Sequence, residues 1–428
     1  MPDKIKILRI FSRLNIGGPA IHTILLTAGL NDDRFESILV KGSEDPYEGN
    51  MLYLAKEKGV DSIIIPEMGR NVSLLGDIRA FLKIYHLVKK EKPHIIHTHT
   101  AKAGALGRWA GISYNLITIC QSKIKKLNSF RKPYGFPVTS YPVRLVHTFH
   151  GHVFYGYFNP LKTYLFLLIE RLLGLFTDRI ITVSEKQRDE ILRFKIGNGK
   201  KVISIPLGLE LERFLDVDKF KGLLRKELGI PLDLKLVGIV ARIVPIKNHK
   251  MFIEAVSELK ETSEVLKVKF LIVGDGELRR KIEDYVREKG LQEDIIFLGF
   301  RRDLEKIYAD LDLVVLTSLN EGSPVALIEA MAAARPVIST DVGGVGNLLS
   351  SEFKAHNSKS HLKYCKEGIL IKSGDVDGLA TATKELLENE ELREKMGLEG
   401  RKRVYPKYDI SRLIEDVRKL YQEIISER

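Results

Sequence analysis

Short apolar runs of strand character alternate with helical patterns along almost the whole sequence, and this alternation constrains the fold more than any other feature. Repeated β/α units build parallel sheets that helices cover on both faces. The first half has strand candidates at 4–11, 37–40, 94–100, 144–150, 179–184 and 202–207. The second half has them at 235–241, 269–276, 295–300, 313–318, 336–340 and 368–371. The sequence therefore predicts an α/β protein with two doubly wound parallel sheets.

The domain boundaries follow from where the β/α series restarts. The length of 428 residues fits two domains of about 200 residues each. The segment Pro206–Phe214 is the expected linker, so we predict an N-terminal domain over 1–208 and a C-terminal domain over 209–406. A last helix is expected from about Asp409 to Glu427, because its apolar residues have helical spacing. We predict that residues 407–428 pack back on the N-terminal domain.

Positive charge is concentrated in the first half of the chain. Residues 1–208 contain 31 Lys and Arg against 17 Asp and Glu, whereas the remainder contains 37 against 39. Such a surplus predicts an anionic partner, which could be a phosphorylated substrate, a nucleic acid or an acidic membrane surface. The alternative is a solvated face in a protein rich in Lys and Glu. Because the sequence contains no recognised nucleic-acid module, we predict no nucleic-acid partner.

Targeting patterns are absent from the sequence. The chain opens directly on a strand candidate rather than a signal peptide, and its two cysteines, Cys120 and Cys365, cannot form a disulfide framework alone. We therefore expect a cytoplasmic protein. The run 150–176 places aromatic residues before an apolar helix, which is either a core helix or, with the basic insertion Ser113–Pro142, a surface resting on anionic lipid. A second, polar insertion, Ser350–Lys366, has no assigned role.

Three features of the second half would meet at one edge of a parallel sheet, because ligands bind at the carboxyl ends of its strands. Arg242 follows a strand candidate, and Lys247 comes five residues later with no acid between them. Such a pair suits a diphosphate, although a structural salt bridge is the alternative for either residue. Gly274 and Gly276 follow the next strand and allow close backbone approach, but the full dinucleotide fingerprint is missing.

The third feature is the stretch "NEGSPVALIEAMAAARPVIST". Ser323 is a suitable N-cap and Pro324 suits the first helical position, so the free amides of this helix start predict an anion site. Glu321 in the loop and Glu329 in the helix would then accept hydrogen bonds from hydroxyl groups on either side of a diphosphate. This arrangement describes a nucleotide sugar. The alternative is that Glu321 repels anions and Glu329 pairs with a core arginine such as Arg335.

The same stretch resembles the E-x7-E signature of the family 4 retaining glycosyltransferases, which have the GT-B architecture of two Rossmann-like domains facing across a cleft. "RIVPIKNH" is similar to that family's Arg…Lys diphosphate clamp, "RLNIGGPAIH" to its Gly-Gly loop, and "HTFHGH" to its His-containing strand end. These motifs occur in the family's order. One departure is Ala334, where the family often has Gly, and alanine should be tolerated unless this residue needs a positive φ.

The resemblance implies roles for the matching residues. Glu321 would hold hydroxyl groups of the donor sugar and Glu329 those of the ribose, while Arg242 and Lys247 would neutralise the diphosphate leaving group. His150 would lie against the donor sugar near the reacting carbon. Fixed cations and helix starts would stabilise the transition state, because breaking a glycosyl–phosphate bond builds negative charge on the leaving oxygens.

Further donor-binding residues are implied at two helix starts. Gly17 and Gly18 would let the first helix approach the phosphates or the acceptor, with Pro19 opening that helix. The remaining implied donor-binding residues are Gly322, Ser323, Pro324 and Val325.

The implied activity is retaining transfer of a hexose-type sugar from a nucleoside-diphosphate sugar, with a UDP-sugar favoured, to a hydroxyl acceptor. The acceptor would be a glycan or a lipid-linked precursor of cell-envelope polysaccharide, which could place the enzyme at the inner face of a membrane. A nucleotide-sugar epimerase of the same architecture is the alternative. We expect no cofactor and no metal, since His97 and His99, on one face of a strand candidate, are more often hydrogen-bonded than metal-bound.

Overall fold

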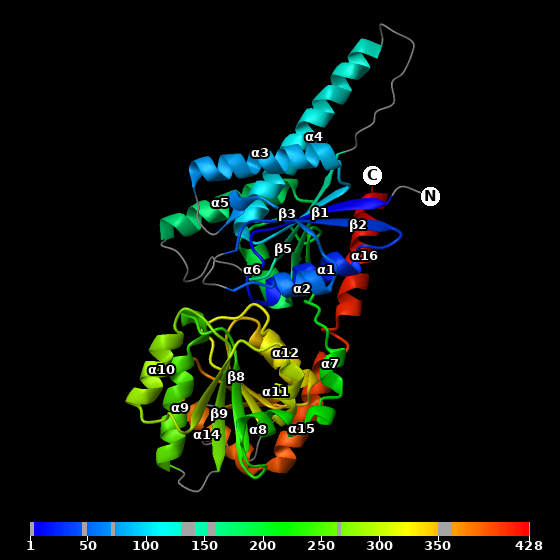
Figure 1. Cartoon of the computed structure of the whole chain (residues 1–428). Coiled ribbons are helices and arrows are strands. Elements are labelled where there is room, and N and C mark those ends of the chain that lie inside the picture. The colour runs from blue at the N-terminus through cyan, green and yellow to red at the C-terminus, as the bar shows by residue number, and fades with distance from the viewer. Residues whose placement is uncertain are drawn as a thin grey trace. The chain divides into compact units, whose positions relative to one another are not determined.

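The chain folds into two compact units, shown in Figure 1. The N-terminal unit comprises Met1–Leu209 together with Ile410–Arg428, and the C-terminal unit comprises Glu210–Asp409. The residues that this computed structural model describes are 4–44, 49–69, 73–129, 142–151, 160–262, 267–349 and 362–427, without the side chains of 123–129. Residues 130–141 of the first predicted insertion, 350–361 of the second and 152–159 of the aromatic run therefore lie outside the described residues.

The sheet of the N-terminal unit has the strand order β3-β2-β1-β4-β5-β6-β7, and all its neighbours are parallel. The chain builds outward from β1 to β3 and then returns to β4 on the other side of β1, which creates a topological switch point between β1 and β4. The strands are β1 (Ile5–Phe11), β2 (Phe35–Lys41), β3 (Ser62–Ile64), β4 (Ile95–His99), β5 (Arg144–Phe149), β6 (Arg179–Thr182) and β7 (Val202–Ser204).

Helices cover both faces of this sheet because alternate strand residues point to opposite sides. Leu8, Ile96 and Leu145 pack with α3 (Leu74–Glu91), α4 (Ala101–Ser129) and α5 (Pro160–Phe176). Their neighbours Ile7, Ile95 and Val146 pack instead with α16 (Ile410–Ser426) and the end of α1 (Gly18–Gly29). The remaining helices are α2 (Leu52–Glu57) and α6 (Glu185–Arg193).

The helix α16 follows the C-terminal unit in sequence but lies in the N-terminal unit. Its buried residues recur every three or four positions, and Leu413 and Tyr421 are completely buried. The chain re-enters beside the point where it left, since the Ile410 amide donates to the Leu209 carbonyl at 3.0 Å. Gly208 makes this approach possible, because a Cβ there would lie only 2.5 Å from the Leu413 Cβ.

The C-terminal unit has a second sheet with the order β10-β9-β8-β11-β12-β14-β13, again with a switch point beside its first strand. All described neighbours are parallel except the antiparallel pair β13–β14. The strands are β8 (Lys235–Val240), β9 (Val268–Val273), β10 (Ile295–Gly299), β11 (Leu313–Leu316), β12 (Val337–Thr340), β13 (Lys363–Cys365) and β14 (Gly368–Ile371). The predicted α/β class with doubly wound parallel sheets is confirmed.

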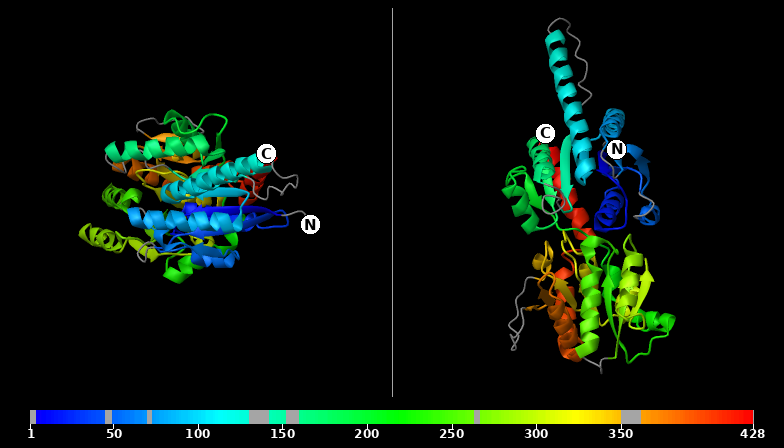
Figure 2. Two further views of the ribbon diagram at one scale, coloured as in Figure 1. Left: turned by 90° about the horizontal axis from the view of Figure 1, so that it is seen from above. Right: turned by 90° about the vertical axis from the view of Figure 1, so that its left-hand side faces the viewer.

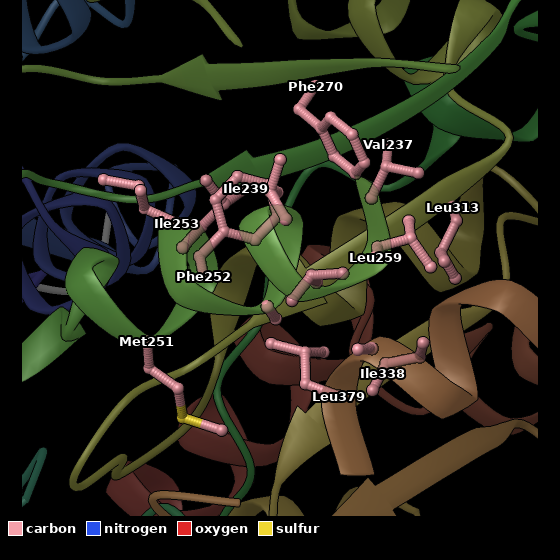
Figure 3. Close-up of a cluster of buried hydrophobic side chains, with 14 of the residues drawn as sticks. Val237, Ile239, Met251, Phe252, Ile253, Leu259, Phe270, Leu313, Ile338 and Leu379 are labelled. Carbon is pink, nitrogen blue, oxygen red and sulfur yellow. The ribbon is translucent and has the colours of Figure 1, made fainter. Parts of the chain in front are cut away.

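The core of this unit is built between the sheet and the long helices α9 (His249–Thr262), α10 (Arg279–Glu288) and α14 (Val376–Glu388). Figure 3 shows its centre, where Phe252 of α9 meets Phe270 of β9 edge to face with ring centroids 6.0 Å apart. The other helices are α7 (Glu212–Leu215), α8 (Leu223–Leu228), α11 (Leu304–Asp310), α12 (Val325–Ala332), α13 (Val345–Leu348) and α15 (Glu390–Val404).

The turn after α12 corrects one expectation. Alanine was expected to be tolerated at this position unless the residue needs a positive φ. Ala334 has a φ of 54°, so the alanine here is strained relative to a glycine. The Ala334 amide donates to the Met331 carbonyl at 2.9 Å and the Arg335 amide to the Ala330 carbonyl at 2.8 Å, which is a Schellman motif. An alanine in this left-handed conformation costs about 1 kcal/mol relative to glycine.

Candidate active site

Loops that follow β8, β9, β11 and β12 meet at the carboxyl edge of the C-terminal sheet. Backbone hydrogen bonds join them in pairs: Ile243 N donates to Asp275 O at 2.9 Å, Leu319 N to Ile246 O at 2.8 Å, and Gly344 N to Glu321 O at 2.8 Å. The Thr340 hydroxyl at the end of β12 donates to the Ser318 carbonyl at 2.6 Å. The sheet edge therefore holds four loops in fixed mutual positions, and these loops carry most of the predicted donor site.

Lys247 and Glu321, 74 residues apart in sequence, form an ion pair at this edge. The Lys247 ammonium and the Ser318 hydroxyl, at 2.6 Å, both donate to Glu321 Oε1. The Glu321 side chain is 8% exposed and that of Lys247 21%. The other carboxylate oxygen, Oε2, makes no hydrogen bond with the described residues, so it is available to a ligand hydroxyl.

Arg242 lies in the loop after β8 and is partly exposed. Its guanidinium makes no ion pair or hydrogen bond within the described part of the chain, which leaves its donors for an anion. The glycines of the next loop support it, since a Cβ at Gly274 would lie 2.0 Å from the Ala241 carbonyl oxygen. One at Gly276 would lie 2.5 Å from the Ile243 carbonyl oxygen. Gly274 and Gly276 therefore allow the backbone of their own loop to pack closely against the loop that carries Arg242.

The helix start beside this loop differs from the prediction by one residue. α12 begins at Val325, and Pro324 is the N-cap with no side-chain hydrogen bond, so the predicted cap role of Ser323 is wrong. The reason is backbone geometry, because Pro324 has a ψ of 86° and lies outside the helix. The amides of Val325 and Ala326 make no hydrogen bond with the described residues. They can therefore still bind an anion.

A glycine pair that the sequence argument passed over holds the Glu321 loop. Gly343 has a φ of 53°, and a Cβ there would lie 1.9 Å from the Glu321 carbonyl oxygen. A Cβ at Gly344 would lie 2.0 Å from the Gly322 carbonyl oxygen. The Gly-Gly dipeptide shortly after a strand candidate was the available signal, because such a pair marks a turn that needs unusual backbone angles.

Glu329 lies inside the unit rather than on its surface. The Tyr308 hydroxyl donates to its Oε2 at 3.1 Å. Burial raises the pKa of the Glu329 carboxyl to about 7, and the Tyr308 hydrogen bond only partly opposes this effect. Arg335 pairs with Asp218 at 3.3 Å, so the alternative pairing of Glu329 with Arg335 is wrong. A contact between Glu329 and a ribose stays a prediction.

In the N-terminal unit, the switch point gathers three histidines. His150 follows β5, and its Nε2 lies 2.9 Å from Nδ1 of His99 at the end of β4. His22 of α1 lies against His150 with ring centroids 4.8 Å apart. Gly17 caps α1 with a φ of 155°, and the helix begins at Gly18, so the proline that follows is its second residue rather than its opening one.

These imidazoles are neutral because they are buried. Burial lowers the pKa of His22 and His99 well below the usual value and that of His150 to about 3. One nitrogen of each lies within 4.8 Å of the others, a spacing that could hold a metal ion. However, the Arg9 cation also lowers the pKa of His22 and His99, and the same field disfavours a metal cation.

His97 is fixed beneath this cluster. Its Nδ1 accepts from the Arg9 guanidinium at 3.0 Å and from the Tyr421 hydroxyl at 2.6 Å. Because arginine only donates, the His97 proton is on Nε2, which donates to the Thr148 hydroxyl at 2.7 Å. Arg9 of β1 thus sets the tautomer of this histidine, and Tyr421 of the C-terminal helix α16 adds a second hydrogen bond to the same nitrogen.

Two family descriptions match the chain, one for each unit. Residues 17–208 match the family described as "Glycosyl transferase 4-like domain". Residues 220–403 match the family described as "Glycosyl transferases group 1". Together these segments contain the residues that were assigned to the donor site.

Two curated relatives match this chain over most of their own length. A UDP-Gal:alpha-D-GlcNAc-diphosphoundecaprenol alpha-1,3-galactosyltransferase of Escherichia coli is 27% identical over 86% of this chain and 85% of the relative. The capsular polysaccharide biosynthesis glycosyltransferase CapM of Staphylococcus aureus is 25% identical, with 85% of each chain covered.

Solved structures share the fold at low sequence identity. HepE of Anabaena, solved with UDP and glucose, superposes with a TM-score of 0.74 at 18% identity over 98% of this chain and 100% of HepE. Sucrose-phosphate synthase of Thermosynechococcus elongatus gives a TM-score of 0.75 at 20% identity over 99% of this chain and 100% of the synthase.

Proposed function

Since this chain belongs to the family 4 glycosyltransferases of GT-B architecture, we propose that it transfers a hexose-type sugar from a UDP-sugar to a hydroxyl acceptor with retention of configuration. The observation that carries this proposal is the meeting of Lys247, Glu321 and the free amides at the start of α12 at one sheet edge. This arrangement offers a cation, a hydroxyl acceptor and an anion site to a single ligand.

The leaving diphosphate would bind at Arg242, Lys247 and the amides of Val325 and Ala326. In the unliganded site the Lys247 ammonium is neutralised by Glu321. A diphosphate competes for this ammonium, and sharing it would free Glu321 to accept hydrogen bonds from the donor sugar. Charge that develops on the leaving oxygens then meets donors that are already in place, which lowers the barrier.

Because Glu321 would hold hydroxyl groups of the donor sugar, we propose that retention proceeds without a covalent enzyme intermediate, the acceptor attacking from the leaving-group side. His150 would contribute as a neutral ring that hydrogen-bonds the donor sugar, since its pKa of about 3 excludes an imidazolium at neutral pH.

We infer that the acceptor is a glycan or a lipid-linked precursor of cell-envelope polysaccharide. The supporting observation is that the Escherichia coli relative is named for a diphosphoundecaprenol-linked acceptor and CapM for capsular polysaccharide. Such an acceptor would place the enzyme at the cytoplasmic surface of a membrane. The epimerase alternative has no support from the family descriptions or from the relatives named above, all of which are transferases.

A thermal-shift panel with UDP, GDP and ADP tests the donor site. A ligand at about 100 times its Kd should stabilise the protein by about 2.7 kcal/mol. UDP should give the largest shift, and Lys247→Ala should reduce it. Incubation with the matching donor sugar, with and without a chelator, then follows product formation and its anomeric configuration. An epimer formed from the donor alone, or an inverted product, would overturn the proposed reaction.

A further inference from the structure

The helix α5 has an apolar stripe that faces away from its own core. Its inner side contains Glu170, Leu173 and Gly174, which are buried. The outer residues recur every three or four positions and therefore lie on one side of the helix. They are Leu161, Tyr164, Leu165, Leu168, Leu172, Leu175 and Phe176, with exposed fractions from 41% to 78%. An amphipathic helix normally turns such a stripe inward, so this one needs a partner.

The two neighbouring helices extend the apolar area. α4 packs against both α3 and α5, and the three helices lie side by side when the N-terminal unit is seen from above (Figure 2). α3 exposes Leu74, Leu75, Ile78 and Leu82, and α4 exposes Trp109, Leu116, Ile117 and Ile119. We call these residues and the α5 stripe the outer apolar face. A large exposed apolar area of this kind marks an interaction site.

Described residues elsewhere in the chain show that this exposure is local. Apart from the helices α3, α4 and α5, the large exposed hydrophobic residues of the N-terminal unit are Leu52, Ile63 and Ile64. The C-terminal unit exposes Leu223, Leu232, Phe300, Leu319 and Leu398, which are scattered singly over its elements. Single exposed leucines are ordinary, whereas an aligned stripe is not.

The charges on the three helices identify the kind of partner. Arg79, Lys89 and Lys90 of α3 and Lys162 of α5 are exposed, whereas α3 has two acidic residues, α5 one and α4 none. Each of these acids is ion-paired: Asp77 with Lys102 at 2.7 Å, Glu91 with Lys6 at 3.1 Å, and Glu170 with Arg108 at 2.8 Å. The surface around the outer apolar face is therefore positive.

We propose that the outer apolar face docks on an anionic lipid bilayer. The stripe of α5 enters the boundary between headgroups and acyl chains, and the surrounding lysines and arginines contact the anionic headgroups. A second copy of this chain fits less well, because a symmetric contact would place cations against cations with no free carboxylate between them. Among the described residues, no helix is long and apolar enough to cross a membrane, so the contact is with the surface.

Vesicle binding tests this proposal independently of the donor site. The full-length protein is sedimented with sucrose-loaded vesicles of phosphatidylcholine alone or with about 30% phosphatidylglycerol, without any donor. The stripe variant is Leu165→Glu/Leu168→Glu, and the matched control is Leu223→Glu/Leu232→Glu in the C-terminal unit. Both variants replace two exposed leucines and change the net charge equally, so any difference between them reports the position of the leucines. Circular dichroism and the UDP-induced thermal shift check that both variants fold and bind UDP as the wild type does.

We expect the wild type and the control to bind the anionic vesicles at low salt, and the stripe variant to bind at least about tenfold more weakly. Higher salt should weaken the binding without abolishing it, because the apolar contact is not screened. Equal binding of the two variants, or no binding of the wild type to anionic vesicles, would overturn the proposal. A wild-type dimer that the stripe substitutions dissociate, without vesicle binding, would assign the face to a second copy instead.

Discussion

The buried carboxyl of Glu329 should make the C-terminal unit less stable as the pH rises. Its pKa is raised from an ordinary 4.5 to about 7, which corresponds to about 3 kcal/mol between the two protonation states. Below pH 4.5 the carboxyl is protonated in both the folded and the unfolded chain, and its contribution to stability is complete. Between pH 4.5 and pH 7 the carboxyl ionises in the unfolded chain but stays protonated in the folded one. The folded state therefore loses stability relative to the unfolded state over this range, and the loss is complete once the pH has risen through 7.

Glu329→Gln isolates this effect, because the amide is neutral at every pH and its oxygen can still accept from Tyr308. Relative to the wild type, the variant should gain about 2 kcal/mol or more in stability between pH 5 and pH 8, or about 4–8 °C in Tm for a domain of this size. The assay is thermal unfolding followed by far-ultraviolet circular dichroism. Trp109, the single tryptophan, lies in the N-terminal unit, and its fluorescence provides the internal control.

A stability difference between the variant and the wild type that is the same at pH 5 and pH 8 would refute this reasoning, since it would mean that Glu329 ionises normally in the folded protein. The same substitution should also reduce the additional Tm that UDP provides, because a ribose would lose its carboxylate acceptor. A variant that is more stable alone at pH 8 but gains less from UDP would show that Glu329 is retained for binding and not for stability.

Three further outcomes test the site. Lys247→Ala and Glu321→Ala should each lower turnover at least about tenfold while leaving the unfolding transition in place, and unchanged kinetics in both would contradict the placement of the donor site. Gly343→Ala should destabilise the protein by about 2 kcal/mol more than Gly290→Ala, because both have positive φ but only the first places a Cβ 1.9 Å from a carbonyl oxygen; equal losses in urea unfolding would argue against this packing. His99→Leu should lower kcat about tenfold, and His99→Asn, whose amide can either donate to or accept from His150, should restore most of it, whereas a purely structural role predicts no such rescue.

The sequence predicted the central strands and the edge strands β7 and β10, but it missed the edge strands β3 and β13, for a physical reason. A central parallel strand is covered on both faces, so it is a continuous apolar run such as 313–316. β3 and β13 lie at sheet edges and have only three residues each. Ile63 and Ile64 of β3 are exposed, and β13 runs antiparallel to its neighbour, so neither has a long apolar run with a β/α connection to mark it.

The candidate site was predictable as a set of motifs but not as a set of contacts. Spacing placed Arg242, Lys247 and Glu321 after strands that share a sheet edge, and they do lie on loops of that edge. The ion pair of Lys247 with Glu321, the support from Gly343 and the burial of Glu329 arise from tertiary packing. No local pattern encodes contacts between loops that are tens of residues apart.

The location of the positive charge favours one of the partner classes that composition left open. Exposed cations such as Arg79, Lys89, Lys90 and Lys162 lie on the helices of the outer apolar face, and the acidic residues of these helices are all ion-paired. A nucleic acid would use these cations but gain nothing from exposed leucines, and a solvated face would need neither. A bilayer uses both, and it also concentrates a lipid-linked acceptor. Leu165→Glu/Leu168→Glu should therefore lower turnover on such an acceptor in vesicles, yet leave turnover on a water-soluble short-chain analogue unchanged; an equal loss on both acceptors would mean that the stripe serves the fold instead.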